Sequence, residues 1–362
     1  MNKVFVLGNG ASCCCGIPVS KNILSELIEI NDKLYQFIDY FQPELIRNGL
    51  IPNIEDVLNY IESISELVSD YEIWDRGKLK EFEAKYDKIR YKYTQDEYET
   101  KIKSSRLFLI DLPFEVQYYK KDLLCKLSNY LWGFYRKQIT GQMYLNKFVK
   151  DCISLGDTII TFNYDLLLEK SLENNEIKYS YLKKLKDGVR ILKMHGSINW
   201  YLQNTKSDEA EDKNFNELVN DYGYCFQRIF KINKNTNVYQ FKTNYINQLD
   251  MDNFPPYLIP PSAMKKYPEL FKELWGLAYE VLEGAGEIKI LGYSLPPVDN
   301  FAKFFFRRLM LIKKSFGLNK NITVYLPRRD KKIVSTRYKK GISSEIKYVP
   351  STFENAIRNG LL

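Results

Sequence analysis

The stretch KVFVLGNGAS, residues 3–12, decides the fold. Its short apolar run stops at a Gly-Asn-Gly turn, and such a run before glycines is typical of a buried parallel strand. A helical pattern follows over about 18–29, with its apolar residues on one face. Strand, glycine turn and helix in this order predict the first unit of a parallel α/β sheet. The turn itself suits either a phosphate or nothing more than a tight strand-to-helix connection.

Apolar runs of strand length recur along the rest of the chain. They predict strands at 158–162, 189–194, 288–291, 322–326 and 346–349. Helical patterns lie between the later runs, at about 268–282 and 298–314. Alternation of this kind predicts an α/β protein with a Rossmann-like, doubly wound parallel sheet.

The carboxyl ends of these strands carry the candidate site. Ligands of doubly wound sheets bind beyond those ends. One crevice is therefore expected to be lined by the loops that follow Leu7, Phe162, Met194, Leu291 and Leu326.

Two segments interrupt the alternation. Residues 31–150 show almost no strand signal, and Asn53 is placed to cap a helix with acidic residues in its first turn, so a large helical insertion after the first strand is predicted. Within it, 76–105 is so rich in charges that a solvated helical face or a mobile excursion is expected. Residues 202–255 are polar and predict a second insertion, on the surface. The remaining residues, 1–30, 151–201 and 256–362, are assigned to the Rossmann-like domain.

Composition narrows the class of protein. Of 362 residues, 45% are hydrophobic and 27% are charged, which is typical of a globular protein and argues against a disordered or fibrous chain. No apolar run approaches the roughly 18 residues of a membrane span. We therefore expect a cytoplasmic protein without a membrane anchor. The net charge of +8 allows an acidic partner, although lysine-rich coding explains it more simply.

Histidine and cysteine limit the chemistry further. The chain has one histidine, His195, so a multi-histidine metal site is excluded and any imidazole chemistry falls at that position. None of its six cysteines forms a C-x-x-C pair, which argues against a zinc module. The run Cys13–Cys15 is interpreted as small packing residues around the first turn or as a redox switch.

Four short motifs stand at the predicted loops. Residues 8–18 read GNGASCCCGIP, 161–165 read TFNYD, 195–196 read HG and 292–295 read GYSL. They resemble the sirtuin motifs GAGxSxxxGIP, TQNID, HG and GTSL, in the same order and each after a predicted strand. The resemblance implies a sirtuin-like fold.

Longer segments are more similar to the bacterial sirtuin-like (SIR2-like domain) NADases of antiviral defence. These are NYD at 163–165, KMHGSINW at 193–200 and GYSLPPVD at 292–299, with Pro260-Pro261 between them. The resemblance covers roughly 1–30, 151–201 and 256–349, and it does not explain the insertions. The chain departs from deacylating sirtuins, which carry two C-x-x-C pairs for zinc and follow GIP with DFR where this chain has VSK.

Residue roles are implied by this resemblance alone. It implies that the catalytic residues are His195, Asn163 and Asp165. It implies that NAD+ is bound by Gly8, Asn9, Gly10, Ala11, Ser12, Tyr164, Gly292, Ser294 and Asp299. Simpler interpretations stay open: His195 as a structural histidine, the Asn163 and Asp165 side chains as helix caps, and the segment after Gly292 as a strand-ending turn.

The activity implied is cleavage of the nicotinamide–ribose bond of NAD+, with NAD+ as substrate and no zinc. As in the similar defence proteins, the chain is expected to be the effector of an anti-phage, abortive-infection system. The expected partners are copies of itself and a separate activator such as a HerA-type ATPase, a short argonaute or a nucleotide-processing enzyme, with nucleic acid involved only indirectly. The alternatives are a non-catalytic NAD or ADP-ribose sensor and a nucleic-acid-binding subunit; deacylation or ADP-ribosyl transfer is more remote.

Overall fold

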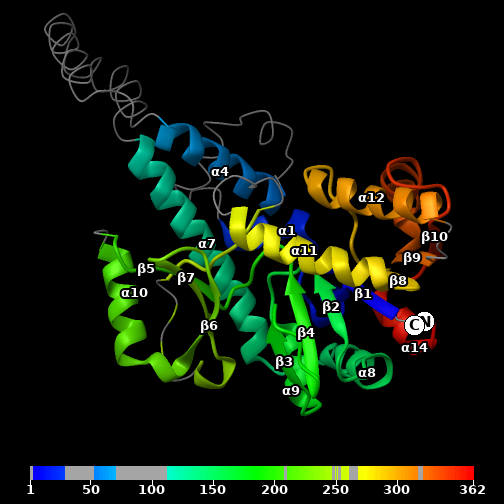
Figure 1. Ribbon diagram of the computed structural model, residues 1–362, viewed down its shortest axis with the longest axis horizontal. Helices are drawn as coiled ribbons and strands as arrows, with labels where there is room; N and C mark the ends of the chain where they lie inside the picture. Colours follow the sequence, from blue (N-terminus) through cyan, green and yellow to red (C-terminus); the bar gives the residue numbers. More distant parts are fainter. Residues whose placement is uncertain are drawn as a thin grey trace, which may run out of the picture.

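The computed structural model describes residues 3–28, 53–70, 112–207, 210–246, 249, 251, 254–260, 268–316 and 321–362. A parallel sheet forms its centre. Its strands are β1 (Lys3–Leu7), β2 (Thr158–Thr161), β3 (Lys178–Tyr181), β4 (Gly188–Lys193), β8 (Glu287–Leu291), β9 (Asn321–Leu326) and β10 (Lys347–Pro350). They lie in the order β10-β9-β8-β1-β2-β4-β3, and every neighbouring pair is parallel (Figure 1).

Strand β1 lies at the centre, where the strand order reverses. Its last residue, Leu7, is in register with Thr161 of β2 on one side and with Leu291 of β8 on the other. The chain builds one half of the sheet through β2, β3 and β4 and the other half through β8, β9 and β10. The predicted doubly wound parallel sheet is therefore confirmed, and in sheets of this kind ligands bind beyond the carboxyl ends of the strands where the order reverses, here at β1.

The degree of burial of each strand explains whether it could be predicted from the sequence. Strands β2 and β4 are buried throughout, and only the first residue of β1 is exposed, so these strands appear as continuous apolar runs. The edge strand β3, with sequence KYSY, was not predicted because it is half exposed and its side chains are polar or amphipathic.

Helices cover the sheet in two groups (Figure 1). One group comprises α8 (Gln142–Cys152), α9 (Leu167–Asn174) and α14 (Phe353–Arg358). The Phe148 ring of α8 packs edge-on against Phe5 of β1 at 5.0 Å and against Phe353 of α14 at 5.5 Å. The other group comprises α11 (Pro268–Gly284) and α12 (Asn300–Phe316), which the sequence predicted. They are joined by Trp275, whose ring meets Phe301 at 4.6 Å.

The described part of the predicted helical insertion is helical. It comprises α4 (Ile54–Asp70), α7 (Leu112–Arg136) and most of α8, while α1 (Ser20–Leu27) precedes the predicted insertion and packs beside α4. Asn53 caps α4 as expected, since its Oδ1 accepts a hydrogen bond from the Glu55 N–H at 3.0 Å. Glu62 of α4 pairs with Lys120 of α7, which ties the two helices together. The charged stretch 76–105 lies outside the described residues.

The polar segment after β4 contains a second sheet, for which the composition gave no strand signal. Strands β5 (Trp200–Asn204), β7 (Thr236–Phe241) and β6 (Phe226–Lys231) pair antiparallel in that order, beside α10 (Ala210–Asp221) (Figure 1). Its core consists of a few buried side chains, chiefly Phe215, Phe226, Val238 and Phe241. Because so few positions are apolar, polar composition concealed the strands. The division of the chain into domains stays a prediction.

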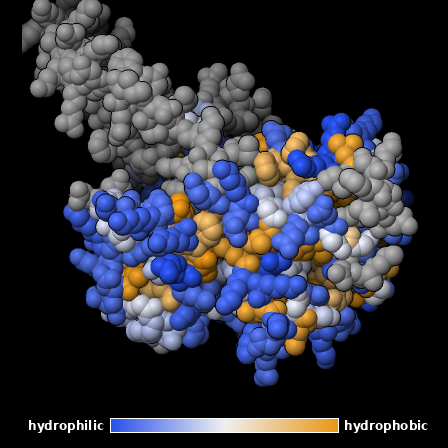
Figure 2. Space-filling model, in the orientation of Figure 1, coloured by the Kyte–Doolittle hydropathy of each residue, from blue (hydrophilic) through white to orange (hydrophobic). Residues whose placement is uncertain are grey.

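The surface of the described residues is mixed in character. Figure 2 shows hydrophilic side chains over much of one face, with apolar groups between them. Among the described residues, no helix combines the length and the apolar character needed to span a bilayer. A short α13 (Lys331–Ile333) and a π-helical turn (Val334–Lys340) lie between β9 and β10.

Candidate functional site

The loop after β1 makes two 3-10 turns, Asn9–Ala11 and Cys13–Cys15. It crosses the loop after β8 at close range, with the Gly10 N–H donating to the Gly292 carbonyl at 2.9 Å. A Cβ atom on Gly10 would lie only 2.7 Å from the Gly292 Cα, and Gly292 itself has a φ of +68°. The packing of two backbones therefore requires glycine at both positions, independently of any ligand.

The N–H groups of this loop are already in use. Those of Gly8, Gly10, Ala11 and Ser12 all donate to backbone carbonyls, and the Asn9 side-chain amide donates to the Pro18 carbonyl at 3.0 Å. In this conformation the loop does not present these N–H groups to a phosphate. Phosphate binding by these residues stays a prediction.

Ser12, Asn163 and Asp165 form a buried polar cluster at the ends of β1 and β2. The Asn163 amide donates to the Ser12 hydroxyl at 3.0 Å, and that hydroxyl donates to Oδ2 of Asp165 at 2.9 Å. Oδ1 of Asp165 accepts from the Leu167 N–H at 3.0 Å, so the expected capping contact at α9 is present as well. The Asn163 Oδ1 is buried and forms no hydrogen bond within the described residues.

A buried ion pair lies next to this cluster. Lys193, at the end of β4, lies 2.9 Å from Oε1 of Glu169, and both side chains are 1% exposed. The same ammonium donates to the Asp165 main-chain carbonyl. Burial raises the pKa of the Asp165 carboxyl, while Lys193 and the hydrogen bonds from Leu167 and Ser12 act in the opposite direction. Sequence reasoning did not identify Glu169, because nothing in its neighbourhood in the chain marks it as buried.

His195 follows β4 and is 3% exposed. Its Nε2 lies 3.2 Å from Oδ2 of Asp299, but without the geometry of a hydrogen bond, and neither ring nitrogen has a hydrogen-bond partner within the described residues. The same Asp299 oxygen accepts from the Tyr293 hydroxyl, and Oδ1 accepts from the Ala302 N–H at 3.1 Å at the start of α12. Asp299 is therefore held rigidly beside the imidazole.

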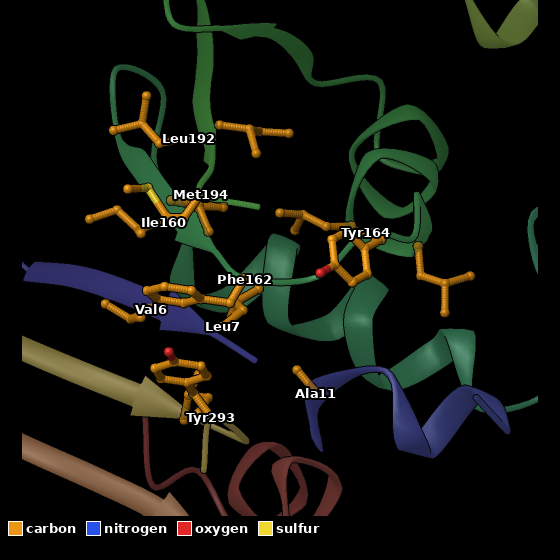
Figure 3. Close-up of a cluster of buried hydrophobic side chains, with 14 of the residues drawn as sticks. Val6, Leu7, Ala11, Ile160, Phe162, Tyr164, Leu192, Met194 and Tyr293 are labelled. Carbon is orange, nitrogen blue, oxygen red and sulfur yellow. The ribbon is translucent and has the colours of Figure 1, made fainter. Parts of the chain in front are cut away.

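Three aromatic residues of the buried cluster in Figure 3, Phe162, Tyr164 and Tyr293, lie close to the imidazole or to its neighbours. Phe162 stacks on Tyr293 with ring centroids 4.0 Å apart and planes 7° apart, and it meets His195 edge-on at 5.1 Å. Tyr164 lies on another side of His195, with ring centroids 6.1 Å apart. Burial, reinforced by nearby carboxylates, raises the pKa of the Tyr164 and Tyr293 hydroxyls well above the ordinary value. Both tyrosines therefore stay neutral near pH 7.

A small hollow, partly open to solvent and with a cavity volume of about 30 Å³, adjoins the polar cluster. This is room for about one water molecule, so a larger ligand requires the lining side chains to move. Its walls come from the loops after β1 and β2 and from the helices of the insertion. The lining residues are Asn9, Ile17, Ile23, Ile54, Glu55, Leu127, Leu131, Phe162, Asn163, Tyr164 and Asp165.

The hollow separates the predicted site residues into two groups. Asn9, Asn163, Tyr164 and Asp165 line it, whereas His195 does not. Phe162 and Tyr164 line the hollow and also contact the His195 ring, so they form the wall between them. Glu55 was treated in the sequence only as an acid in the first turn of a helix, and the structure adds it to the lining.

The loop after β8 is braced from behind. The Arg337 guanidinium donates to the Ser294 carbonyl at 3.2 Å, and the Tyr338 hydroxyl donates to the Tyr293 carbonyl at 2.6 Å. Leu295 has a φ of +52°, in the left-handed region that a leucine rarely adopts. Both braces come from the π-helical turn, so this turn fixes the loop that carries Gly292 and Ser294.

Cys13 and Cys15, in the second turn of the first loop, have raised thiol pKa values. Burial, followed by the neighbouring Cys14 and Asp165, raises the pKa of Cys13 to about 11. A hydrogen bond with Cys14, followed by burial, raises the pKa of Cys15 still further. Such thiols are poor nucleophiles near pH 7. Within the residues that the structure describes, no three His, Cys, Asp or Glu side chains are grouped so that they could hold a metal ion.

Fold and site together define a doubly wound α/β protein with a polar site where the strand order reverses. The family model described as SIR2-like domain matches residues 157–245. That segment contains Asn163, Tyr164, Asp165 and His195, and it also runs through β5, α10, β6 and β7. No sequence among the curated proteins matches the chain.

Several solved structures are similar at low identity. Sir2Tm bound to a propionylated peptide has 10% identity and a TM-score of 0.33, with 99% of this chain and 91% of that chain covered. A Sir2 complex with an inhibitor, 2′-O-acetyl-ADP-ribose and a deacetylated p53 peptide has 11% identity and a TM-score of 0.34, covering 99% and 92%. A mutant Sir2 with p53 peptide and NAD has 11% identity and a TM-score of 0.34, covering 99% and 90%. These TM-scores are too low to support an argument. The fold is therefore assigned from the strand order of this chain itself.

Proposed function

We propose that this protein hydrolyses NAD+ at the bond between nicotinamide and ribose, giving nicotinamide and ADP-ribose. The observation that carries the proposal is the position of Asn163. Its amide donates to the Ser12 hydroxyl, which in turn donates to Asp165, at the point where the strand order reverses. Its Oδ1 is buried in the wall of the hollow and has no hydrogen-bond partner among the described residues. The SIR2-like match over this segment supports the same ligand.

The chemistry needs little from an acid. Nicotinamide is already a cation in NAD+, so the C1′–N bond breaks with its electron pair leaving on neutral nicotinamide. Positive charge then develops on the ribose, as in glycoside cleavage. Water adds at C1′ and releases a proton. A protein contributes by orienting the ribose and by placing negative charge near C1′.

Each predicted residue takes a role in this proposal. Asn163 orients the ribose or the attacking water, and Asp165 with the backbone at Tyr164 holds the carboxamide. His195 acts as a base toward a ribose hydroxyl or water. The glycine loop with Asn9, Ala11 and Ser12, and the second loop with Gly292, Ser294 and Asp299, hold the ribose and phosphates.

Phosphate binding needs a change from the present conformation, because the first loop uses its own N–H groups. Positive charge is available close by: the Arg329 side chain acts to lower the pKa of Cys13 on this loop. Arg329 is exposed, so it can reorient toward a pyrophosphate. This arginine adds to the contacts that the sequence proposed.

The Phe162 and Tyr164 side chains separate His195 from the hollow, and this favours the interpretation that the enzyme is inactive in the present conformation. NAD+ in the hollow cannot reach His195 until the Phe162 or Tyr164 side chain moves. An NADase in a living cell must be gated, and we propose that an activating partner supplies that movement. The defence role, a homo-oligomer in the cytoplasm, and a HerA-type ATPase, short argonaute or nucleotide-processing enzyme as activator belong to the same proposal and rest on the resemblance in sequence.

The test is nicotinamide release from NAD+ by the full chain, alone and with the products of neighbouring genes. We expect release by the wild type, and a loss of at least 100-fold in His195→Ala and in Asn163→Ala, within the range that such groups contribute. Tight NAD+ binding without nicotinamide release, in every mixture, would instead show a sensor. Unchanged turnover in His195→Ala would overturn the role of the histidine.

A further inference from the structure

Glu55 brings the helical insertion into the site. It lies in the first turn of α4, and its backbone N–H donates to Asn53, the cap of that helix. Although glutamate is rarely buried, this side chain is only 8% exposed, and it lines the hollow opposite the loop after β2. Its neighbour Asp56 is exposed on the same turn, so helix propensity and the helix dipole alone do not explain why an acid is buried at position 55.

The charge of Glu55 acts directly on the aromatic wall. Its carboxylate contributes to the raised pKa of Tyr164 and also to that of Tyr293. The Tyr164 ring lies near His195, and the Tyr293 ring stacks on Phe162, which also contacts His195. The negative charge of Glu55 therefore acts on aromatic side chains close to the histidine. A cation entering there would be favoured.

Among the described residues that line the hollow, two are acids, Glu55 and Asp165. Both oxygens of Asp165 accept hydrogen bonds from within the loop, from Ser12 and from Leu167. In this structure the Asp165 carboxylate therefore helps to hold the loop in place. Glu55 comes from α4, a different part of the chain, and lines the same hollow as Asn163.

We propose that Glu55 is a further catalytic residue, whose carboxylate faces the nicotinamide ribose and accepts the proton of the attacking water. This inference rests on the proposed NAD+ hydrolysis. The C1′–N bond breaks with its electron pair leaving on nicotinamide, the water oxygen forms the new bond to C1′, and the water proton passes to Glu55. His195 is then left to act on a ribose hydroxyl.

The first test compares the binding of two ligands that differ in the charge of one ring. NAD+ carries a cationic nicotinamide, and NADH carries a neutral ring in its place. Binding is measured by calorimetry in a His195→Ala background, so that substrate is not consumed. We expect NAD+ to bind about tenfold more tightly than NADH, and Glu55→Gln to bring that ratio close to one. Asp56→Asn, one residue away but exposed, is the matched control and keeps the ratio.

The second test is turnover in an otherwise wild-type chain. Glu55→Gln is expected to lower kcat about 100-fold with little change in KM or in thermal midpoint, while Asp56→Asn stays at the wild-type rate. A merely structural Glu55 would instead lower the midpoint and leave kcat unchanged.

The outcomes separate the two proposals. If the wild type releases nicotinamide and Glu55→Gln does so equally well, the role of Glu55 is wrong and the proposed function stands. If Asp56→Asn changes the NAD+ to NADH ratio as much as Glu55→Gln does, the assignment to Glu55 is also wrong. If the wild type neither binds NAD+ nor releases nicotinamide, the proposed function is wrong and the inference falls with it.

Discussion

Replacing Lys193 with methionine tests the support beneath the site. The lysine lies 2.9 Å from Glu169 with both side chains 1% exposed, and it also donates to the Asp165 carbonyl. Methionine fills much of the same volume but removes the charge. After this substitution the Glu169 carboxylate stays buried and keeps the hydrogen bond from the Tyr181 hydroxyl, which is 2.9 Å long. The Asp165 carbonyl loses its hydrogen bond from the lysine.

The magnitude follows from these losses. Removing one partner of a buried ion pair costs about 3–5 kcal/mol, because a charge stays buried without compensation. We therefore expect Lys193→Met to lower the free energy of unfolding by about 4 kcal/mol. Adding Glu169→Gln removes the stranded charge, so the double variant should recover about 2 kcal/mol of this loss. The loop that carries Asp165 should also lose its fixed position.

The assay is equilibrium unfolding in urea, with the two single variants and the double variant forming one cycle. A strongly favourable coupling between the two residues is the expected result. The reasoning is refuted if Lys193→Met costs less than about 1 kcal/mol, or if the effects of the two changes simply add.

Two further predictions concern the loops after β8 and β1. Gly292→Ala is expected to lower the free energy of unfolding by at least about 3 kcal/mol, because φ at Gly292 is +68° and the new Cβ would lie 2.5 Å from the Ala11 nitrogen. Gly133→Ala is the control, since its new Cβ would meet nothing within 4 Å. In the same urea measurement it should be neutral or stabilising. Because the pKa of Cys13 is raised from 9.0 to about 11, its thiolate at pH 8 should be about 100-fold scarcer than that of an ordinary thiol. Iodoacetamide labelling followed by mass spectrometry should show correspondingly slow modification of Cys13; labelling as fast as in the urea-unfolded chain would contradict this.

Sequence patterns were sufficient for the centre of the sheet. Strands β1, β2, β4 and β8 are buried on both faces, and such strands must be apolar almost throughout. Their positions predicted that Ser12, Asn163 and Asp165 would meet, although about 150 residues separate the first from the others, because parallel strands end at the same edge. The edge strand β3 and the small sheet were missed, since half-exposed strands need few apolar residues.

The parts of the site that depend on packing between distant segments could not be predicted from the sequence. Nothing near Glu55 in the chain indicates that α4 lies over the loop after β2. The burial of Glu169 beside Lys193 depends in the same way on how α9 meets β4. The screening of His195 depends on where two rings, Phe162 and Tyr164, come to rest. Motif spacing places residues at a sheet edge, but it does not determine which side chain closes over another.

The most direct test of the central claim is the structure of the His195→Ala protein with NAD+ at saturating concentration. The account predicts that the nicotinamide ribose lies in the hollow between Asn163 and Glu55, beside the Tyr164 ring, with the phosphates toward the loop that begins at Gly8. NAD+ bound at another place on the protein, with this hollow left as it is, would contradict it.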